Sequence, residues 1–269
     1  MSTPPLHIES LAFWTPTLPG WEPARAAFRG EGALSDPPAK RPSPAVLAPA
    51  ERRRAPDTVA LALEVAAAAT TASGRDPREL PCIFVCSEGD MSINDYMCTT
   101  LATDPTLLSP TKFHNSVHNA PVGYWTIGTG CTEASTSLSA FDRSFAAGLL
   151  EAATQCATDG RALLLVAYDI AAIGALASAT LSEGMLAVAM VLSPEPTAKS
   201  VATLGWSLVP GTGVAIPLRS EAARSLQRNA MADALPLFEA LATGSAESLD
   251  LPLSRSLSLR IQLTPTAPT

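Results

Sequence analysis

The feature that most constrains the fold is residues 135–169, which read as a strand, a sharp turn, a long helix and a second strand. Residues 135–141 (STSLSAF) alternate small apolar with hydroxyl side chains, a pattern that suits a buried strand. A helix then opens at Asp142, with an apolar face formed at a spacing of four by Phe145, Leu149 and Ala153. Residues 161–168 (RALLLVAY) are continuously apolar and predict a central strand covered on both faces.

The same alternation of strand and helix runs through most of the chain. Strands are predicted at 6–13, 82–86, 186–192 and 201–209, with one or two more at 249–263. Helices are predicted at 57–72, 92–101 and 220–242, the first capped by Asp57 and followed by Gly74, the last broken at Pro236. The Pro-rich residues 14–50 show little periodicity and are predicted to be irregular. This order predicts a single α/β domain over residues 1–269, with a mixed sheet and helices on both faces.

The stretch that leads into this unit carries spaced residues that resemble a known family. Ser109-Pro110, Asn119, Gly123 and Gly130 precede the strand and turn at the spacing found before the nucleophile of the β-ketoacyl synthases, which have the thiolase-like fold. The resemblance implies one thiolase-like half, truncated relative to a full ketosynthase. An ungapped count places Asp142 at the nucleophilic cysteine, and a looser alignment places Leu138 there.

Two longer segments resemble one branch of this family. Residues 113–125 (FHNSVHNAPVGYW) and 144–152 (SFAAGLLEA) look like the chain-length-factor-like partners of ketosynthases in aryl polyene pathways. The resemblance implies a heterodimer with a catalytic ketosynthase, an acyl carrier protein as a further partner, and an edge strand at 134–141. It also implies that the partner and tunnel interface includes Phe113, His114, Asn115, Ser116, His118, Asn119, Tyr124 and Ser137.

Neither alignment supplies a thiol at the nucleophile position, and Asp cannot form a stable acyl thioester. A helix N-cap is a sufficient structural reason for Asp142, because its carboxylate would accept hydrogen bonds from free N–H groups. The family's acid–base residues lie downstream of the nucleophile, whereas the three histidines of this chain all precede Asp142. Cys131 precedes the strand and is read as a buried, inert thiol.

Two functions therefore follow from the sequence. The first is a non-catalytic subunit that pairs with an active β-ketoacyl synthase and shapes its acyl tunnel. The second is an acyl-thioester hydrolase or decarboxylase on a remodelled scaffold, with Asp142 as the base. A second polar group converging on Asp142 in a cleft, with a raised carboxylate pKa, would favour the second function. A buried Asp142 bonded only to backbone amides would favour the first.

Composition limits the classes of partner and ligand that the chain is expected to bind. The formal net charge of −7 argues against nucleic-acid binding, and no apolar run reaches membrane-spanning length. Five cysteines at irregular spacing predict free, mostly buried thiols and a cytoplasmic protein. Arg52, Arg53 and Arg54 form a basic cluster that either meets a carrier protein or simply borders a helix. His114 and His118 lack the other ligands of a metal site, so neither a metal nor a cofactor is expected.

Overall fold

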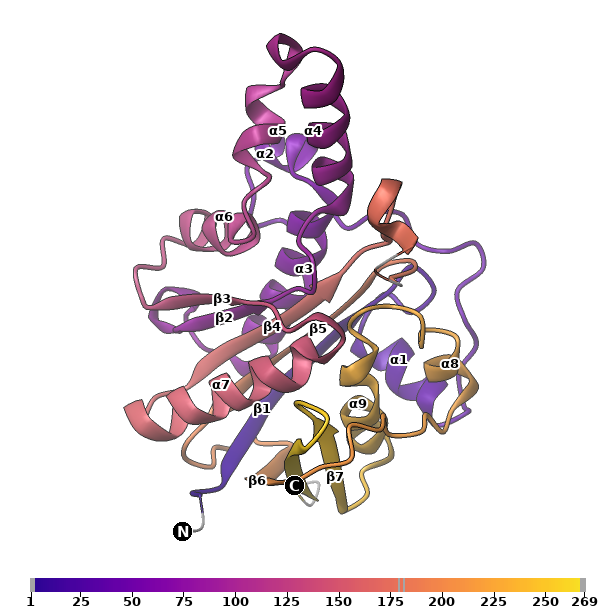
Figure 1. Cartoon of the computed structure of the whole chain (residues 1–269). Helices are drawn as coiled ribbons and strands as arrows, with labels where there is room; N and C mark the ends of the chain where they lie inside the picture. Colours follow the sequence, from indigo (N-terminus) through magenta and orange to yellow (C-terminus); the bar gives the residue numbers. More distant parts are fainter. Residues whose placement is uncertain (1–2, 179, 181, 267–269) are drawn as a thin grey trace.

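A mixed sheet of eight strands runs through the protein (Figure 1). The computed structural model describes residues 3–178, 180 and 182–266. The strands lie in the order β3 (Ser135–Leu138), β2 (Cys82–Val85), β4 (Leu163–Asp169), β5 (Leu186–Ser193), β1 (Leu6–Trp14), β6 (Ala202–Pro210), β8 (Leu257–Pro265) and β7 (Glu247–Pro252). β3, β2 and β4 are parallel, and the other pairs are antiparallel. β3 and β7 are therefore the two edges of the sheet.

Helices cover both faces of the sheet, which confirms the predicted fold class. α3 (Asp57–Ser73) and α6 (Ala120–Thr129) pack on one face, and α7 (Ser144–Asp159), α1 (Trp21–Phe28) and α9 (Leu235–Thr243) lie over the other (Figure 1). Every residue of β4 is buried, and its side chains alternate between the two cores. Leu163 and Leu165 belong to the α7 side, whereas Leu164 and Val166 belong to the α3 side. Such two-sided burial explains the continuous apolar run.

In β1, the residues that face the core change from even-numbered to odd-numbered positions at a β-bulge. Leu6 and Ile8 face the core under α7 and α9, and past the bulge so do Leu11 and Phe13. The pairing of β1 with β5 shifts register between Ile8 and Ser10, which leaves Glu9 as the extra residue. Without this residue, one half of the strand would turn its apolar side chains to the wrong face.

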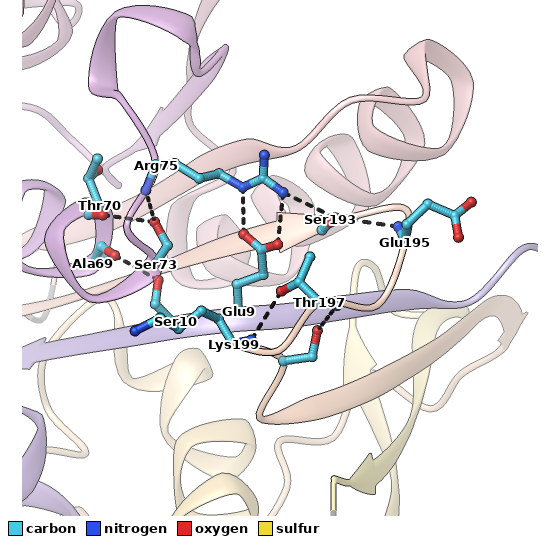
Figure 2. Close-up of polar contacts among 11 residues, drawn as sticks. Glu9, Ser10, Ala69, Thr70, Ser73, Arg75, Ser193, Glu195, Thr197 and Lys199 are labelled. Carbon is cyan, nitrogen blue, oxygen red and sulfur yellow. Dashed lines mark hydrogen bonds and ion pairs between the residues drawn. The ribbon is translucent and has the colours of Figure 1, made fainter. Parts of the chain in front are cut away.

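The extra residue at the bulge is held by an arginine that follows α3. The buried carboxylate of Glu9 accepts two hydrogen bonds from Arg75, at 2.5 Å from Nε and 2.8 Å from Nη2 (Figure 2). Beside it, Ser10 Oγ donates to the carbonyl of Ala69 at 2.7 Å (Figure 2). Both polar side chains of β1 therefore have hydrogen-bond partners on the α3 side of the sheet, as buried polar groups require.

Close packing of α7 against the sheet depends on a glycine. A Cβ atom at Gly148 would lie 2.4 Å from Cγ2 of Val85 on β2, so only glycine lets the helix approach this closely. The helix ends at Gly160, whose φ of 62° lies in the left-handed region that favours glycine. Both features confirm the reading of α7 as a helix packed on the central strands.

A helical arm projects from the sheet beside β2. It consists of α4 (Met91–Thr103) and α5 (Pro110–His114), which point away from the body of the molecule (Figure 1). Asp90 caps α4 by accepting a hydrogen bond of 3.0 Å from the N–H of Ile93. In the same view α2 (Pro49–Arg54) overlaps the arm. No helix of the described ranges is long and apolar enough to cross a membrane.

Several local predictions were wrong. Residues 14–50 are not irregular throughout, because they include α1 and the start of α2. Asp57 does not cap α3: it is the first helical residue, and its carboxylate pairs with Arg41 at 2.8 Å. The expected helix at 220–242 is instead α8 (Glu221–Arg224), a short 3-10 turn η5 (Ala232–Ala234) and α9, with Pro236 in the first turn of α9. Proline is tolerated there because that N–H has no helical partner.

Candidate functional site

The turn between β3 and α7, which we call the elbow, has a strained backbone. Phe141 has φ 52° and is the only non-glycine residue with positive φ in the described ranges. It opens the 3-10 turn η3 (Phe141–Arg143), and α7 begins only at Ser144. The side chain of Phe141 is exposed. Strained positions of this kind concentrate at functional sites. Phe141 therefore joins Asp142 and Leu138 as a third candidate for the position that aligns with the nucleophilic cysteine.

The expected role of Asp142 as the cap of α7 was wrong. Its side chain is 84% exposed, and its nearest charged partner is Arg143, with Oδ1 3.8 Å from Nε. Asp142 lies inside the 3-10 turn, two residues before the first residue of α7, so it has no place at the helix terminus. Asp142 is therefore not buried against backbone amides, and its carboxylate is exposed beside Arg143.

The carboxylate that caps α7 comes from elsewhere in the chain. Asp233, on η5, accepts a hydrogen bond of 3.0 Å through Oδ2 from the N–H of Ala146. Its Oδ1 is buried and has no hydrogen-bond partner in the described part of the chain. Burial, with a smaller contribution from the nearby charge of Asp142, raises the pKa of Asp233 to about 8, although the hydrogen bond from Ala146 acts in the opposite direction. Asp233 is therefore the carboxyl with a raised pKa in the cleft beside Asp142.

A cleft of about 890 Å³ opens at the elbow, and we call it the elbow cleft. Its walls come from the turn after β2, the elbow, Thr180, the loop after β6, the segment that leads into α9, and the end of β7. It lies beyond the carboxyl ends of the parallel strands β2 and β3, which is where open α/β sheets bind ligands. Ser87, Phe141, Ile216 and Asp233 stand on four of these walls.

A second buried carboxylate, Asp169 at the end of β4, is hydrogen-bonded to segments that line this cleft. It accepts hydrogen bonds from the N–H of Ser87 at 3.0 Å and from Ser182 Oγ at 3.2 Å. Ser182 Oγ in turn accepts from the N–H of Ala230 at 3.2 Å. Burial raises the pKa of Asp169 to about 6, and the hydrogen bonds that it accepts limit the rise. One carboxylate thus connects three separate segments at the elbow cleft.

The cysteines offer no activated thiol at the elbow. Cys82, Cys86, Cys131 and Cys156 are buried, and Cys98 on α4 is exposed. Burial raises the pKa of Cys82 and of Cys156 to about 12, and it also raises that of Cys86. A nucleophilic thiol needs a lowered pKa, so these three are structural. In the described ranges, no group of three or more His, Cys, Asp or Glu side chains could hold a metal ion.

The predicted interface residues divide between exposed and structural positions on the arm and the segment after it. Phe113 is 60% exposed on α5, and His114 and Asn119 are also exposed. Asn115 is buried and bonds back to the carbonyl of Thr111 at 3.0 Å, and Ser116 is half-buried and donates to the carbonyl of Phe113. His118 is half-buried, with Nε2 3.1 Å from the carbonyl oxygen of Cys86. The structure therefore leaves Phe113, His114 and Asn119 on the surface.

The remaining interface candidates lie on or beside the β3 edge. β3 is the outermost strand and is partly exposed, which confirms the expected edge and corrects the expectation of a buried strand. Ser137 and Leu138 are half-buried on this strand. Tyr124 is half-buried on α6, which packs beside β2 and β3. The arm and the β3 edge are thus neighbouring parts of one side of the molecule (Figure 1).

The three arginines of α2 do not act alike. Arg52 donates to the carbonyl of Leu47 at 2.8 Å and so holds the chain that enters the helix. Arg53 and Arg54 are exposed. The cluster therefore includes one structural arginine and two solvent-facing ones.

The sequence reading missed Asp169 and Asp233 as parts of the site. A signal existed for Asp169, because a carboxylate directly after a continuous apolar strand falls at the carboxyl end of the sheet. Asp233 gave no such signal, because it lies in an Ala-rich segment 87 residues from its partner Ala146. Only the fold brings Asp233 next to Ala146.

Comparison with known proteins identifies the same family as the sequence resemblance. Residues 29–253 match the sequence model described as the β-ketoacyl synthase N-terminal domain. No curated protein matches this chain by sequence.

Solved structures share the fold at low identity. A ketosynthase in complex with its chain length factor from Xenorhabdus doucetiae is 19% identical, with a TM-score of 0.71, over 97% of this chain and 99% of that one. The ishigamide ketosynthase/chain length factor is 12% identical, with a TM-score of 0.72, over 97% and 99%. The type II polyketide synthase acyl-carrier protein complex with its ketosynthase, AntDE:AntF, is 10% identical, with a TM-score of 0.76, over 99% and 100%. At these identities the likeness shows the fold alone.

Proposed function

This chain belongs to the β-ketoacyl synthase family, through the N-terminal domain of that family, and we propose that it is a non-catalytic, chain-length-factor-like subunit. In this role it pairs with a catalytic β-ketoacyl synthase and shapes the acyl tunnel of that partner. The shared fold with ketosynthase and chain length factor complexes supports a role of this kind.

The observation that carries the proposal is the chemistry of the elbow. Leu138, Phe141 and Asp142 are the three candidates for the nucleophile position, and none has a thiol or hydroxyl group. A condensing enzyme needs a group that accepts the acyl chain as a covalent intermediate. None of the buried cysteines in the described ranges lies at the elbow: Cys82 is on β2, Cys86 directly follows β2, Cys131 precedes β3 and Cys156 is on α7.

The surface beside the elbow supports a partner. β3 presents an edge of unpaired backbone groups, which favours pairing with another chain. Near it, the arm and α6 expose large apolar side chains that monomeric proteins normally cover. These are Leu101, Leu107, Phe113, Val117 and Ile127. We assign this face to the catalytic ketosynthase, with Phe113 and Tyr124 near the far end of its tunnel.

Two finer assignments belong to the same proposal. Arg53 and Arg54 are exposed on α2 and can meet the acidic side chains of an acyl carrier protein or the phosphate of its prosthetic arm. The resemblance of residues 113–125 and 144–152 points to an aryl polyene pathway.

The geometry does not favour the hydrolase or decarboxylase that would use Asp142 as its base. A general base of this kind needs burial or a neighbouring charge to raise its pKa toward neutrality. Asp142 is exposed and lies beside Arg143. The buried carboxyl of the cleft is Asp233, and one of its oxygens is already bonded to a helix N–H.

Co-expression with a candidate catalytic ketosynthase tests the proposal. A tagged chain is expected to retain the ketosynthase in a 1:1 complex, and the chain alone should form no acyl adduct that mass spectrometry detects. Ser135→Lys puts a charge on the β3 edge and should weaken the complex. Ser248→Lys is the matched control, because it changes an exposed serine on the opposite edge strand β7. Equal loss of the complex in both variants, or an acyl adduct on the isolated chain, would reject the proposal.

A further inference from the structure

The arm is stiffened from within by Tyr96 on α4. The Tyr96 hydroxyl accepts a hydrogen bond of 3.0 Å from the N–H of Ser109 and donates one of 3.2 Å to the carbonyl of Leu107. The Nζ atom of Lys112 lies 3.8 Å from the centre of the Tyr96 ring, in a cation–π contact. One side chain thus joins α4 to the 3-10 turn η2 (Pro105–Leu107) and to α5. We expect the arm to move as one body, whose direction depends on how its base is held.

A first anchor holds the place where the chain enters the arm. Asp90, directly before α4, is buried, and its Oδ1 caps the helix through the N–H of Ile93. Its Oδ2 accepts a hydrogen bond of 2.9 Å from Oγ1 of Thr58, in the first turn of α3. Thr58 is itself buried. The start of α4 is therefore tied to a helix that covers the sheet.

A second anchor holds the place where the chain leaves the arm. Nε2 of His118, four residues after the end of α5, is 3.1 Å from the carbonyl oxygen of Cys86. Because a carbonyl oxygen only accepts, Nε2 carries the proton of this hydrogen bond. The N–H of Cys86 in turn donates to the carbonyl of Leu138 on β3 at 3.2 Å, so the acceptor is held by the sheet. The end of the arm is therefore tied to the carboxyl end of β2.

A third contact supports the side of α4. This helix packs against the 3-10 turn η4 (Gly174–Ser178), and Asp95 lies so close to Gly174 that no larger residue fits at that position. In the described ranges no hydrogen bond joins α4 to η4. Hydrogen bonds are directional, so the two anchors define the angle of the arm more narrowly than this packing does.

The exposed apolar side chains of the arm lie far from both anchors. Leu101 is in the last turn of α4 and Leu107 is in η2, beyond the part of the arm that joins the body (Figure 1). A helix of 13 residues is about 20 Å long, so a change of about 10° at its base moves its far end by about 3 Å. Protein interfaces are packed as densely as protein interiors, and a displacement of this size separates groups that have to touch.

We propose that Thr58 and His118 are positioning residues of the partner surface: through Asp90 and Cys86 they fix the direction of the arm before the ketosynthase binds. The inference rests on the proposed role of the arm in binding that partner. A surface already held in its bound arrangement loses less conformational entropy on association, so both anchors increase affinity without touching the partner. His118 thus acts by holding the arm rather than by contacting the ketosynthase.

Distances between two spin labels in the isolated chain test the positioning without the partner. Cys98 on α4 is exposed and the other four cysteines are buried, so one nitroxide can be attached there. A second, at Ala68→Cys, occupies an exposed position on α3. His118→Asn should broaden the distance distribution about twofold or more, because its amide is too short to reach the carbonyl of Cys86. His118→Gln keeps a donor at the position of Nε2 and should restore the width.

The first anchor is tested with the same labels. Thr58→Val removes the hydroxyl that bonds to Asp90 and should broaden the distribution, whereas Thr58→Ser keeps it and should not. Phe113→Ala is the control, because it shortens an exposed side chain of the arm and leaves both anchors intact. Equal widths for His118→Asn and His118→Gln, or for Thr58→Val and Thr58→Ser, would overturn the proposal, as would an equal broadening by Phe113→Ala.

Affinity for the ketosynthase connects the direction of the arm to the partner. In unlabelled chains His118→Asn should weaken binding about 10-fold or more, and His118→Gln should restore it. Surface plasmon resonance with the immobilised ketosynthase measures both. A broadened arm with unchanged affinity would overturn the inference, because the anchors would then not serve docking. No complex with the unaltered chain would instead reject the proposed function itself, whatever the label distances show.

Discussion

Asp233 accepts a hydrogen bond of 3.0 Å from the backbone N–H of Ala146, and so caps a helix that begins 89 residues before it in the sequence. The bond ties the segment before α9 to the elbow, where the backbone is strained at Phe141. A helix N-terminus favours negative charge, but burial of Asp233 outweighs this effect and raises its pKa. The elbow therefore depends on a contact made only in the folded chain.

Replacing Asp233 by Asn should stabilise the chain increasingly as pH rises. The pKa of Asp233 rises from 3.8 to about 8 on folding, so the stability that the bound proton provides is complete below pH 3.8 and is lost as pH approaches 8. Asn mimics the protonated form of Asp233. The melting temperature of the Asp233→Asn variant minus that of the unaltered chain should therefore increase from pH 5 to pH 8 and then level off. Thermal melts at four pH values measure this, with Glu31→Gln, an exposed side chain outside the elbow cleft, as the control. A variant less stable than the unaltered chain at pH 9 would contradict the raised pKa.

Gly148→Ala should destabilise the fold by about 1–3 kcal/mol. The added Cβ would lie 2.4 Å from Val85 Cγ2, so α7 must move away from β2. Gly123→Ala on α6 is the matched control, because nothing lies within 4 Å of its added Cβ and alanine favours helix more than glycine does. Urea denaturation of both variants measures the difference. The interpretation fails if the two substitutions shift the midpoint in the same direction and by the same amount.

Arg75→Ala should cost about 2–4 kcal/mol, because it leaves the carboxylate of Glu9 buried without its partner. Changing both residues, as Glu9→Met with Arg75→Met, should cost less than Arg75→Ala alone. Chemical denaturation of the single and double variants gives the comparison. Arg78→Ala removes an ion pair at the surface and should have a smaller effect. An effect of Arg75→Ala no larger than that of Arg78→Ala would show that Glu9 finds another partner.

Phe141→Gly should be more stable than Phe141→Ala by about 1 kcal/mol. The exposed ring loses little packing in either variant, and only glycine adopts φ 52° without steric cost. Urea denaturation measures the difference in stability between the two variants. Both variants lose the same ring, so the difference reports mainly the backbone strain. Equal stabilities would mean that the elbow relaxes when the ring is removed.

Phe113→Ala or Tyr124→Ala should lengthen the products of the complex with the ketosynthase. A bulky side chain at the end of an acyl tunnel stops elongation by steric overlap, and a smaller one leaves room. Mass spectrometry of the released chains gives their length, and size-exclusion chromatography verifies that the complex still forms. The exposed Leu101 on α4 provides an alanine control for general loss of the interface. Unchanged lengths in an intact complex would leave this chain as a structural partner only.

The sequence by itself determined the local elements and the family. Continuous apolar runs gave the two-sided burial of β4 and β5, and glycines marked the ends of α3 and α7, because burial and backbone conformation act on each residue directly. The spaced residues before the elbow gave the resemblance that the family comparison confirmed.

Tertiary structure alone decided the register of β1 and the cap of α7. The bulge at Glu9 depends on its pairing with β5 and on Arg75, 66 residues further along the chain. Asp142 had the local pattern of a cap, yet Asp233 took this position because the segment before α9 packs onto the N-terminus of α7. Hydrogen bonds between distant segments depend on how the whole chain packs, and a local pattern does not contain that information.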